Sequence, residues 1–239
     1  MPSISYTLLP RYCILLSMPE SDITTATDCK NLFRRAYENR YSWDKDFKGY
    51  AGSCIYQKGS IIYQGQFVIT SDLKPKVKNI KDDKITKLIS SQLWEVAIHR
   101  VKRSFEDVHG GNTFTSGDVN HIGLEVLVGG QSKGDSYRIK DDIVTMVNRH
   151  MHGSLINILT KEIKDTGQGY LSISYKSQYF DPLSKQAKSG KCLYEDNFIP
   201  LGIQEQWVLE SRSIQKFDLE GIDSENEKFF FRELSLIDN

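Results

Sequence analysis

The sequence predicts an α+β fold in which a strongly curved antiparallel sheet has one long helix packed across it. The helix is predicted over residues 82–111, where apolar side chains recur every fourth position. About nine or ten strand-like runs fill most of the remaining chain, and most are separated by short turns. Short connections favour antiparallel pairing over βαβ crossovers, and a sheet with so many strands curls or closes. We therefore expect a half-barrel with the helix across its open face, around an apolar cavity.

The long helix is predicted from its apolar stripe and its ends. The stripe consists of Ile85, Ile89, Leu93, Ala97, Val101 and Phe105. Asp82 and Asp83 lie where a helix start favours negative charge, and Gly110 and Gly111 supply a stop. A stripe of this width is buried on one side, so we expect the helix to lie on the sheet.

The other elements follow from periodicity and turn residues. Helical spacing predicts a first helix over residues 28–41. Strands are predicted over residues 50–57, 61–70, 76–80, 124–128, 136–140, 143–148 with its continuation over 149–159, 169–179, 191–200, 207–213 and 229–236. Residues 221–227 are predicted as a turn or a mobile loop.

Composition narrows the class of protein. The chain has 31 basic and 31 acidic residues, and this balance disfavours a nucleic-acid-binding role. No apolar run approaches the roughly 20 residues of a transmembrane helix. The four cysteines show no metal-binding spacing, which indicates free thiols in a reducing, cytoplasmic compartment. We expect residues 28–239 to form a single domain, and residues 1–27 to be a disordered tail or to include an over-called start before Met18.

The stretch VNRHMHG holds the strongest candidates for chemistry. His150 and His152 alternate along a predicted strand, so both are expected to project from one face, with Arg149 on the other. Two such histidines need a third ligand to hold a metal, and His99 or His109 of the long helix could supply it. Polar packing or surface exposure is the simpler interpretation, so we assign no metal, no cofactor and no catalytic residue.

Aromatic residues are a second theme. They are concentrated in the first third of the chain, and most are expected to belong to the core. If the curved sheet encloses a cavity, we expect its lining to include Trp43, Tyr50, Trp94 and Phe105. Such a cavity would suit a planar or lipid-like ligand.

Several stretches, taken together, resemble the domain-of-unknown-function 3386 family of cyanobacteria and photosynthetic eukaryotes. They are LFRRAYENRYSWDKDFKGY, QLWEVAIHRVKRSFEDVHGGNTF, GLEVLVGGQSKGDSYRIKDD, VNRHMHG and DTGQGYLSISYKSQYFDP, and they cover residues 30–182 in order. The resemblance implies a cyanobacterial cytoplasm or a plastid stroma and a role connected with photosynthesis, but no activity. The architecture is also similar to the LolA-like lipoprotein carriers and to the calyx of phycobilin lyases.

Three functional hypotheses result. The first is a non-enzymatic protein that binds a hydrophobic ligand (a lipid, a pigment or a tetrapyrrole) or assists assembly of a photosystem or antenna protein. The second is an enzyme, either a pigment lyase or a metal-dependent hydrolase, that uses a cluster of His99, His109, His150 and His152. The third is a structural partner in a complex, which would expose a large apolar patch.

Overall fold

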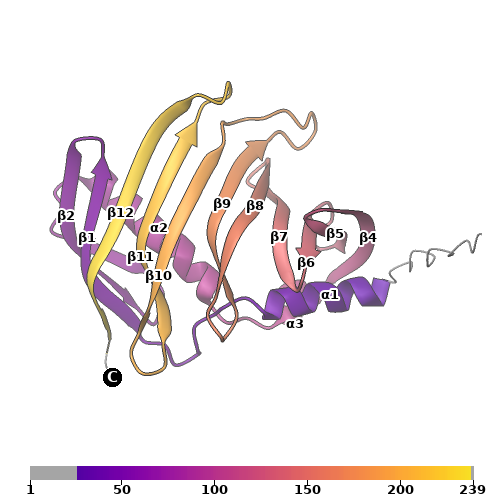
Figure 1. Ribbon diagram of the computed structural model, residues 1–239, viewed down its shortest axis with the longest axis horizontal. Coiled ribbons are helices and arrows are strands. Elements are labelled where there is room, and N and C mark those ends of the chain that lie inside the picture. Colours follow the sequence, from indigo (N-terminus) through magenta and orange to yellow (C-terminus); the bar gives the residue numbers. More distant parts are fainter. Residues whose placement is uncertain (1–25, 238–239) are drawn as a thin grey trace, which may run out of the picture.

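A computed structural model describes residues 26–237, which form three helices and twelve strands (Figure 1). The helices are α1 (Ala26–Glu38), α2 (Asp83–Arg100) and α3 (Phe105–His109). The strands are β1 (Gly49–Lys58), β2 (Ile61–Thr70), β3 (Pro75–Lys78), β4 (Asn112–Asn120), β5 (Gly123–Gly130), β6 (Ser136–Lys140), β7 (Ile143–Met151), β8 (Ser154–Asp165), β9 (Tyr170–Phe180), β10 (Cys192–Leu201), β11 (Gln206–Phe217) and β12 (Asp223–Leu236). The prediction for the N-terminal tail lies outside the described residues, except that α1 begins at Ala26.

All twelve described strands form one antiparallel sheet. Its order is β3-β2-β1-β12-β11-β10-β9-β8-β7-β6-β5-β4, so most neighbours along the chain are neighbours in space. The edge strands β3 and β4 do not pair, and the sheet stays open and curved (Figure 1). The segment that joins these two edges contains α2 and α3, so it must cross the whole sheet. The predicted fold class, a curved antiparallel sheet with a helix across it, is confirmed.

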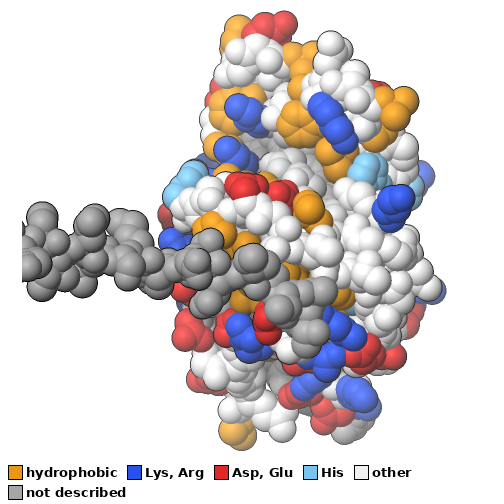
Figure 2. All heavy atoms as spheres, turned by 90° about the vertical axis from the view of Figure 1, so that its right-hand side faces the viewer, with side chains coloured by type: hydrophobic (Ala, Val, Ile, Leu, Met, Phe, Trp, Pro, Cys, Tyr) orange, Lys and Arg blue, Asp and Glu red, His pale blue; other side chains and the backbone are white. Residues whose placement is uncertain are grey.

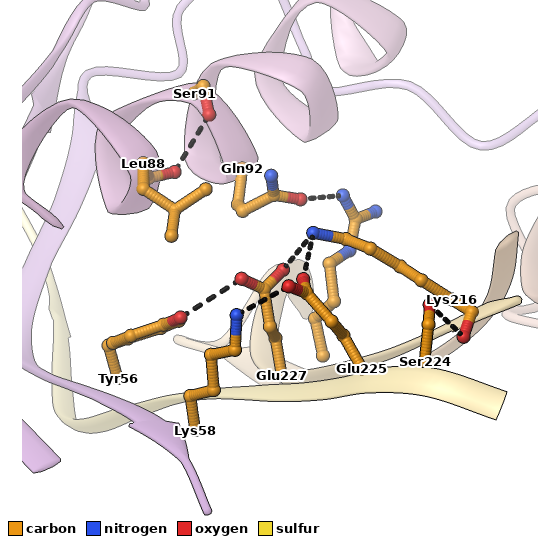
Figure 3. Close-up of polar contacts among 10 residues, drawn as sticks. Tyr56, Lys58, Leu88, Ser91, Gln92, Lys216, Ser224, Glu225 and Glu227 are labelled. Carbon is orange, nitrogen blue, oxygen red and sulfur yellow. Dashed lines mark hydrogen bonds and ion pairs between the residues drawn. The ribbon is translucent and has the colours of Figure 1, made fainter. Parts of the chain in front are cut away.

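The register shows that the helices pack on the same face of the sheet. Directly opposite residues of paired strands project to one face. One such row runs from Lys216 through Cys192, Ser177, Ile158 and Val147 to Tyr137. Lys216 lies below α2 (Figure 3), and Tyr137 packs against Phe33 of α1 with ring centroids 4.4 Å apart. We call this face the covered face.

Two separate hydrophobic cores lie on the covered face. The first packs Ile89, Leu93, Val96 and Ala97 of α2 on strands β1, β2 and β9–β12. The second packs Cys29, Phe33 and Ala36 of α1 on β4–β6, together with Phe105 of α3. β7 and β8 lie between the cores, and side chains there and in the adjoining parts of β9 and β10 are half-buried, including Ile158, Thr160, Tyr175 and Tyr194.

The predicted helix over residues 82–111 is wrong beyond Arg100, because it is two helices. Val101 leaves the helix in an extended conformation (ψ 123°), and it bridges to Trp43 in the segment after α1. The Trp43 amide donates to the carbonyl of Arg100 at 2.8 Å. This hydrogen bond satisfies one of the carbonyls that the end of α2 leaves without a partner inside the helix. Ser104 then caps α3, where its hydroxyl accepts from the Asp107 amide at 3.1 Å.

The predicted strand over residues 149–159 is also wrong, because it contains a hairpin turn. β7 ends at Met151 and β8 begins at Ser154. His152 and Gly153 form the turn with positive φ values of 49° and 72°, a conformation that glycine adopts at no steric cost. The prediction also missed β4, and it placed a turn or loop over residues 221–227, most of which belong to β12.

No helix among residues 26–237 combines the length and the apolar character that crossing a bilayer requires.

Candidate functional site

A buried ion pair lies on the covered face, below α2. Arg212 of β11 and Asp196 of β10 are opposite residues in the sheet, and each side chain is 2% exposed. The guanidinium donates to both oxygens of the carboxylate, with Nε–Oδ1 and Nη2–Oδ2 distances of 2.7 Å. This two-pronged geometry is the strongest form of an arginine–carboxylate contact.

The remaining donors of Arg212 tie the sheet to the helix. Nη1 donates to Gln92 Oε1 of α2 at 3.0 Å and lies 3.3 Å from Glu95 Oε1. Nη2 donates to the hydroxyl of Tyr175 at 2.9 Å, which in turn donates to Glu95 at 3.3 Å. The Arg212 network therefore fixes one side of α2 above β9–β11.

Two stacked tyrosines border this network. The rings of Tyr175 and Tyr194 lie 4.7 Å apart and almost parallel, at 6°. Burial first, and the carboxylate of Glu95 second, raise the pKa of Tyr194. The pKa of Tyr175 is raised for the same first reason, although the charge of Arg212 opposes the shift. Both phenols are therefore neutral at pH 7. They are half-buried, so they offer an aromatic surface on the covered face.

The positive charge of four arginines acts on His99 of α2. More than a third of His99 is open to solvent, yet its pKa is lowered to about 4. The first cause is desolvation, and the second is the positive charge of Arg100, Arg40, Arg212 and Arg149. The exposed fraction and the lowered pKa agree if the ring of His99 touches water while the protein around it at longer range still desolvates it. The result is a positively charged region between the two cores.

The four arginines differ in how their charge is compensated within residues 26–237. Arg212 pairs with Asp196, and Arg149 lies 3.6 Å from the Asp135 carboxylate, which it shares with His150. Arg40 and Arg100 form no ion pair with any described carboxylate. Arg100 donates to the Tyr41 carbonyl at 3.4 Å, but its Nε is buried without a hydrogen-bond partner. Such an atom is costly unless something else binds it.

A second polar cluster lies further along the covered face (Figure 3). Lys216 reaches Glu225 at 3.2 Å and Glu227 at 2.8 Å, Tyr56 donates to Glu227 at 2.9 Å, and Lys58 donates to Glu225 at 2.7 Å. Figure 3 shows these side chains below α2, with Leu88 and Gln92 pointing toward them from the helix. The charges in this cluster are matched, so its role is to hold β1, β11 and β12 in place.

The structure does not bring the four candidate histidines together. His109 lies in the second core, 8% exposed, between the rings of Phe33, Tyr37 and Phe105. His150 lies on β7 with Nδ1 3.2 Å from Asp135, and His152 lies in the following turn, so the two do not alternate on one strand. Residues 26–237 contain no group of three or more His, Cys, Asp or Glu side chains that could hold a metal.

The expected cavity lining is mostly core. Trp43, Tyr50 and Phe105 are 2%, 0% and 1% exposed. Trp43 and Tyr50 pack in the first core, and Phe105 packs in the second. Trp94 is 49% exposed on α2. Of the site residues predicted from the sequence, Arg149 and His99 are the ones that fall in the charged region of the covered face.

His109 makes folding stability depend on pH. Burial first, and nearby arginines second, lower its pKa to about 4. An unfolded histidine has a pKa near 6.5 and binds a proton first as the pH falls. The stabilising contribution is therefore complete above about pH 6.5 and is lost as the pH falls toward 4. Between pH 7 and pH 4.5, His109 should lower the free energy of unfolding by about 2 kcal/mol. We expect His109→Gln to abolish this decrease, measured by urea unfolding at the two pH values. His121→Gln is the matched control, because His121 is exposed in the turn between β4 and β5; an equal effect of both variants would contradict this assignment.

The fold and site define a class: an open, curved antiparallel sheet with two helix-covered cores and a charged, aromatic surface between them. The sequence identifies the family. The model for "Protein of unknown function (DUF3386)" matches residues 24–237, so the chain belongs to this family. The match continues through the C-terminal third, beyond the stretches that carried the resemblance.

Comparison with other proteins adds little beyond the family. No curated protein matches the sequence. One similar solved structure is described as a candidate outer membrane lipoprotein-sorting protein domain from Vibrio parahaemolyticus, with 4% identity, a TM-score of 0.32, and coverage of 89% of this chain and 93% of that chain. Another is the LolA superfamily protein NE2245 from Nitrosomonas europaea, with 8% identity, a TM-score of 0.29, and coverage of 88% and 94%. Scores of this size carry no argument about ligand or activity.

Sequence reasoning missed most of the site. Arg40, Arg100, Arg212, Tyr175 and Tyr194 come from five separate elements or linkers, and no local pattern connects them. One signal was available in β11, where Arg212 lies on the same strand face as Ile214 and closely follows the buried run Trp207–Leu209. A charged residue at such a position indicates a buried partner.

Proposed function

We propose that this protein is a non-enzymatic binding protein for an amphipathic anion, held on the covered face between the two cores. The anionic group would lie among Arg40, Arg100 and Arg149, and the apolar body would lie on Ile158 and the tyrosine pair. The observation that carries the proposal is the group of Arg40, Arg100 and Arg149, in which two arginines form no ion pair with a described carboxylate and the third shares Asp135 with His150. A carboxylate or phosphate would neutralise this positive charge.

The family resemblance narrows the ligand further. A photosynthetic lineage favours an acidic lipid or a tetrapyrrole, since both combine an apolar body with carboxylate or phosphate groups. The client would then be a photosystem or antenna protein that receives the ligand, and the compartment would be a cyanobacterial cytoplasm or a plastid stroma. The enzyme hypothesis depended on a histidine cluster, and no observation on residues 26–237 favours it.

Paired ligands of equal chain length test the anionic part. We expect oleate to bind and oleyl alcohol to bind at least about tenfold more weakly, because a charge-assisted hydrogen bond contributes about 1.5–3 kcal/mol. Isothermal titration calorimetry measures both affinities. Equal affinity for the two ligands would refute the role of the arginines.

Two matched variants locate the site. Arg149→Gln removes a guanidinium that is 51% exposed and lies near one aspartate, and Arg35→Gln removes one that is 57% exposed and pairs with Asp142. We expect Arg149→Gln to weaken oleate binding about tenfold and Arg35→Gln to leave it unchanged. If both variants bind like the original protein, the ligand lies elsewhere.

Purification of the tagged protein from its own host in mild detergent tests the finer proposal. An absorption spectrum and lipid mass spectrometry of the eluate identify a bound pigment or lipid, and peptide mass spectrometry identifies the client. A colourless, lipid-free and solitary protein would contradict the pigment and assembly roles.

A further inference from the structure

At one end of the strands, turns and loops expose apolar side chains beside lysines. The turn between β7 and β8, the end of β9 and the loop from β9 to β10 meet there, at the upper edge in Figure 1. Leu183 is 92% exposed, Tyr179 is 42% exposed and Met151 is 40% exposed. We call this surface, together with Lys185 and Lys188, the β9–β10 tip.

Strand pairing and hydrogen bonds hold the tip together as a defined structure. Leu155 of β8 pairs with Phe180 of β9, and Lys188 donates to Ser154 Oγ at 3.0 Å, so the loop is fastened to the β7–β8 turn. The Asp181 carboxylate accepts from the amides of Leu183 and Ser184 at 3.0 and 2.8 Å. Leu183 is therefore held outward by an ordered turn.

The charge around the tip is positive. Lys185 and Lys188 follow Leu183 in the same loop, and Lys133 lies in the β5–β6 turn, where Gly134 approaches the His150 ring. The nearby acidic side chains are engaged within the protein: Asp135 is 6% exposed and contacts Arg149 and His150, and Asp181 is held by its own loop. Figure 2 shows Lys and Arg side chains beside hydrophobic ones in the upper part of the molecule.

Other exposed apolar turns have a different setting. Ile203, in the β10–β11 turn at the lower edge, is 103% exposed and is followed by Gln204 and Glu205. Leu219 and Ile222, in the β11–β12 turn, are flanked by Asp218, Glu220 and Asp223. Apolar and aromatic side chains combined with lysines are the composition that binds anionic bilayer surfaces.

We propose that the β9–β10 tip docks the protein on a bilayer surface that carries anionic headgroups. Leu183 and Met151 enter the interfacial region, Tyr179 lies at headgroup depth, and the lysines pair with lipid phosphates. A hollow of about 370 Å³ lined by Leu155, Phe180 and Lys185 lies beside the loop and is open to a headgroup. This inference goes beyond the proposed ligand site, because the tip contains none of the three arginines.

Vesicle co-sedimentation tests the proposal with the full chain. Vesicles of phosphatidylcholine alone are compared with vesicles in which phosphatidylglycerol replaces a third of the lipid. We expect binding to the anionic vesicles only, and we expect added salt to weaken it, because a lysine near an anionic surface contributes about 1 kcal/mol. Equal binding to both vesicle types, or to neither, would overturn the proposal.

Matched variants separate docking from loss of fold. We expect Lys185→Glu with Lys188→Glu, and Leu183→Ser alone, each to lower the partition coefficient about tenfold or more. Lys102→Glu with Arg103→Glu, in the α2–α3 linker, and Ile203→Ser at the opposite edge are the controls, and we expect them to bind normally. Thermal unfolding shows that each variant is folded. A control that loses binding as strongly as the tip variants refutes the assignment.

Arg149→Gln distinguishes the two proposals, because we expect it to weaken oleate binding and to leave vesicle binding unchanged.

Discussion

Replacing Asp196 with alanine is expected to lower the free energy of unfolding by about 3–5 kcal/mol. The substitution leaves the guanidinium of Arg212 buried, 2% exposed, without the carboxylate that accepts two of its hydrogen bonds. Glu95 is the remaining nearby carboxylate, at 3.3 Å, and its side chain is 39% exposed, so water screens its charge. Urea unfolding at pH 7 measures the loss.

Two comparisons test whether the unpaired charge is the cause. Glu106→Ala removes the carboxylate of a surface pair with Arg34, where the side chains are 52% and 36% exposed, and it should cost less than about 1 kcal/mol. The double variant Arg212→Met with Asp196→Leu removes both charges and should recover most of the stability. A double variant as unstable as Asp196→Ala would show that lost packing, rather than an unpaired charge, is responsible.

Replacing Phe105 with alanine is expected to destabilise the protein by about 3–5 kcal/mol. Phe105 is 1% exposed and packs edge-on against Phe33, with ring centroids 5.6 Å apart, and against His109 and Phe114 at 5.2 and 5.9 Å. The truncation leaves a cavity where α3 meets α1 and β4, because these rings come from separate elements that cannot all close over the gap. Thermal and urea unfolding measure the effect.

Trp94→Ala is the matched control for this prediction. Both aromatic residues were expected to line a ligand cavity, but Trp94 is 49% exposed, so its removal should cost less than about 1 kcal/mol. Oleate binding should survive in both variants under folding conditions, since neither side chain belongs to the proposed site. A Phe105→Ala variant of unchanged stability that loses oleate would instead restore the cavity-lining role.

Elements with a long, regular pattern were predicted well from the sequence. β1, β2, β6 and β9 agree with their predicted ranges within about two residues, since an apolar face or a clear turn marks each of them. The errors lie where a local pattern competes with a tertiary contact. The apolar stripe of the long helix continues through Val101 to Phe105, so the break at Arg100 has no local signal. That break depends on the segment around Trp43, whose amide donates a hydrogen bond to the carbonyl of Arg100 at the end of α2.

The candidate site was predicted only at single residues. Arg149 and His99 were named from a histidine-rich strand and a helix edge, and both lie in the charged region. Their grouping was wrong, because His150 lies on β7, His152 lies in the turn that follows β7, and His109 lies in the second core. Arg212 and Asp196 are 16 residues apart on neighbouring strands. Their contact depends on the β10–β11 register, which includes a bulge between Asn197 and Phe198 that no local pattern marks.

By itself, the sequence determined the family, the α+β class, the antiparallel sheet and the apolar face of α2, because each depends on residue type and short-range periodicity. The tertiary structure alone decided which strands form the edges, where the long helix breaks, and which charges meet. These features arise from contacts between residues that are distant along the chain, such as Trp43 with Arg100 and Arg212 with Gln92. Curvature and register bring such residues together on the covered face, and local preferences do not encode either one.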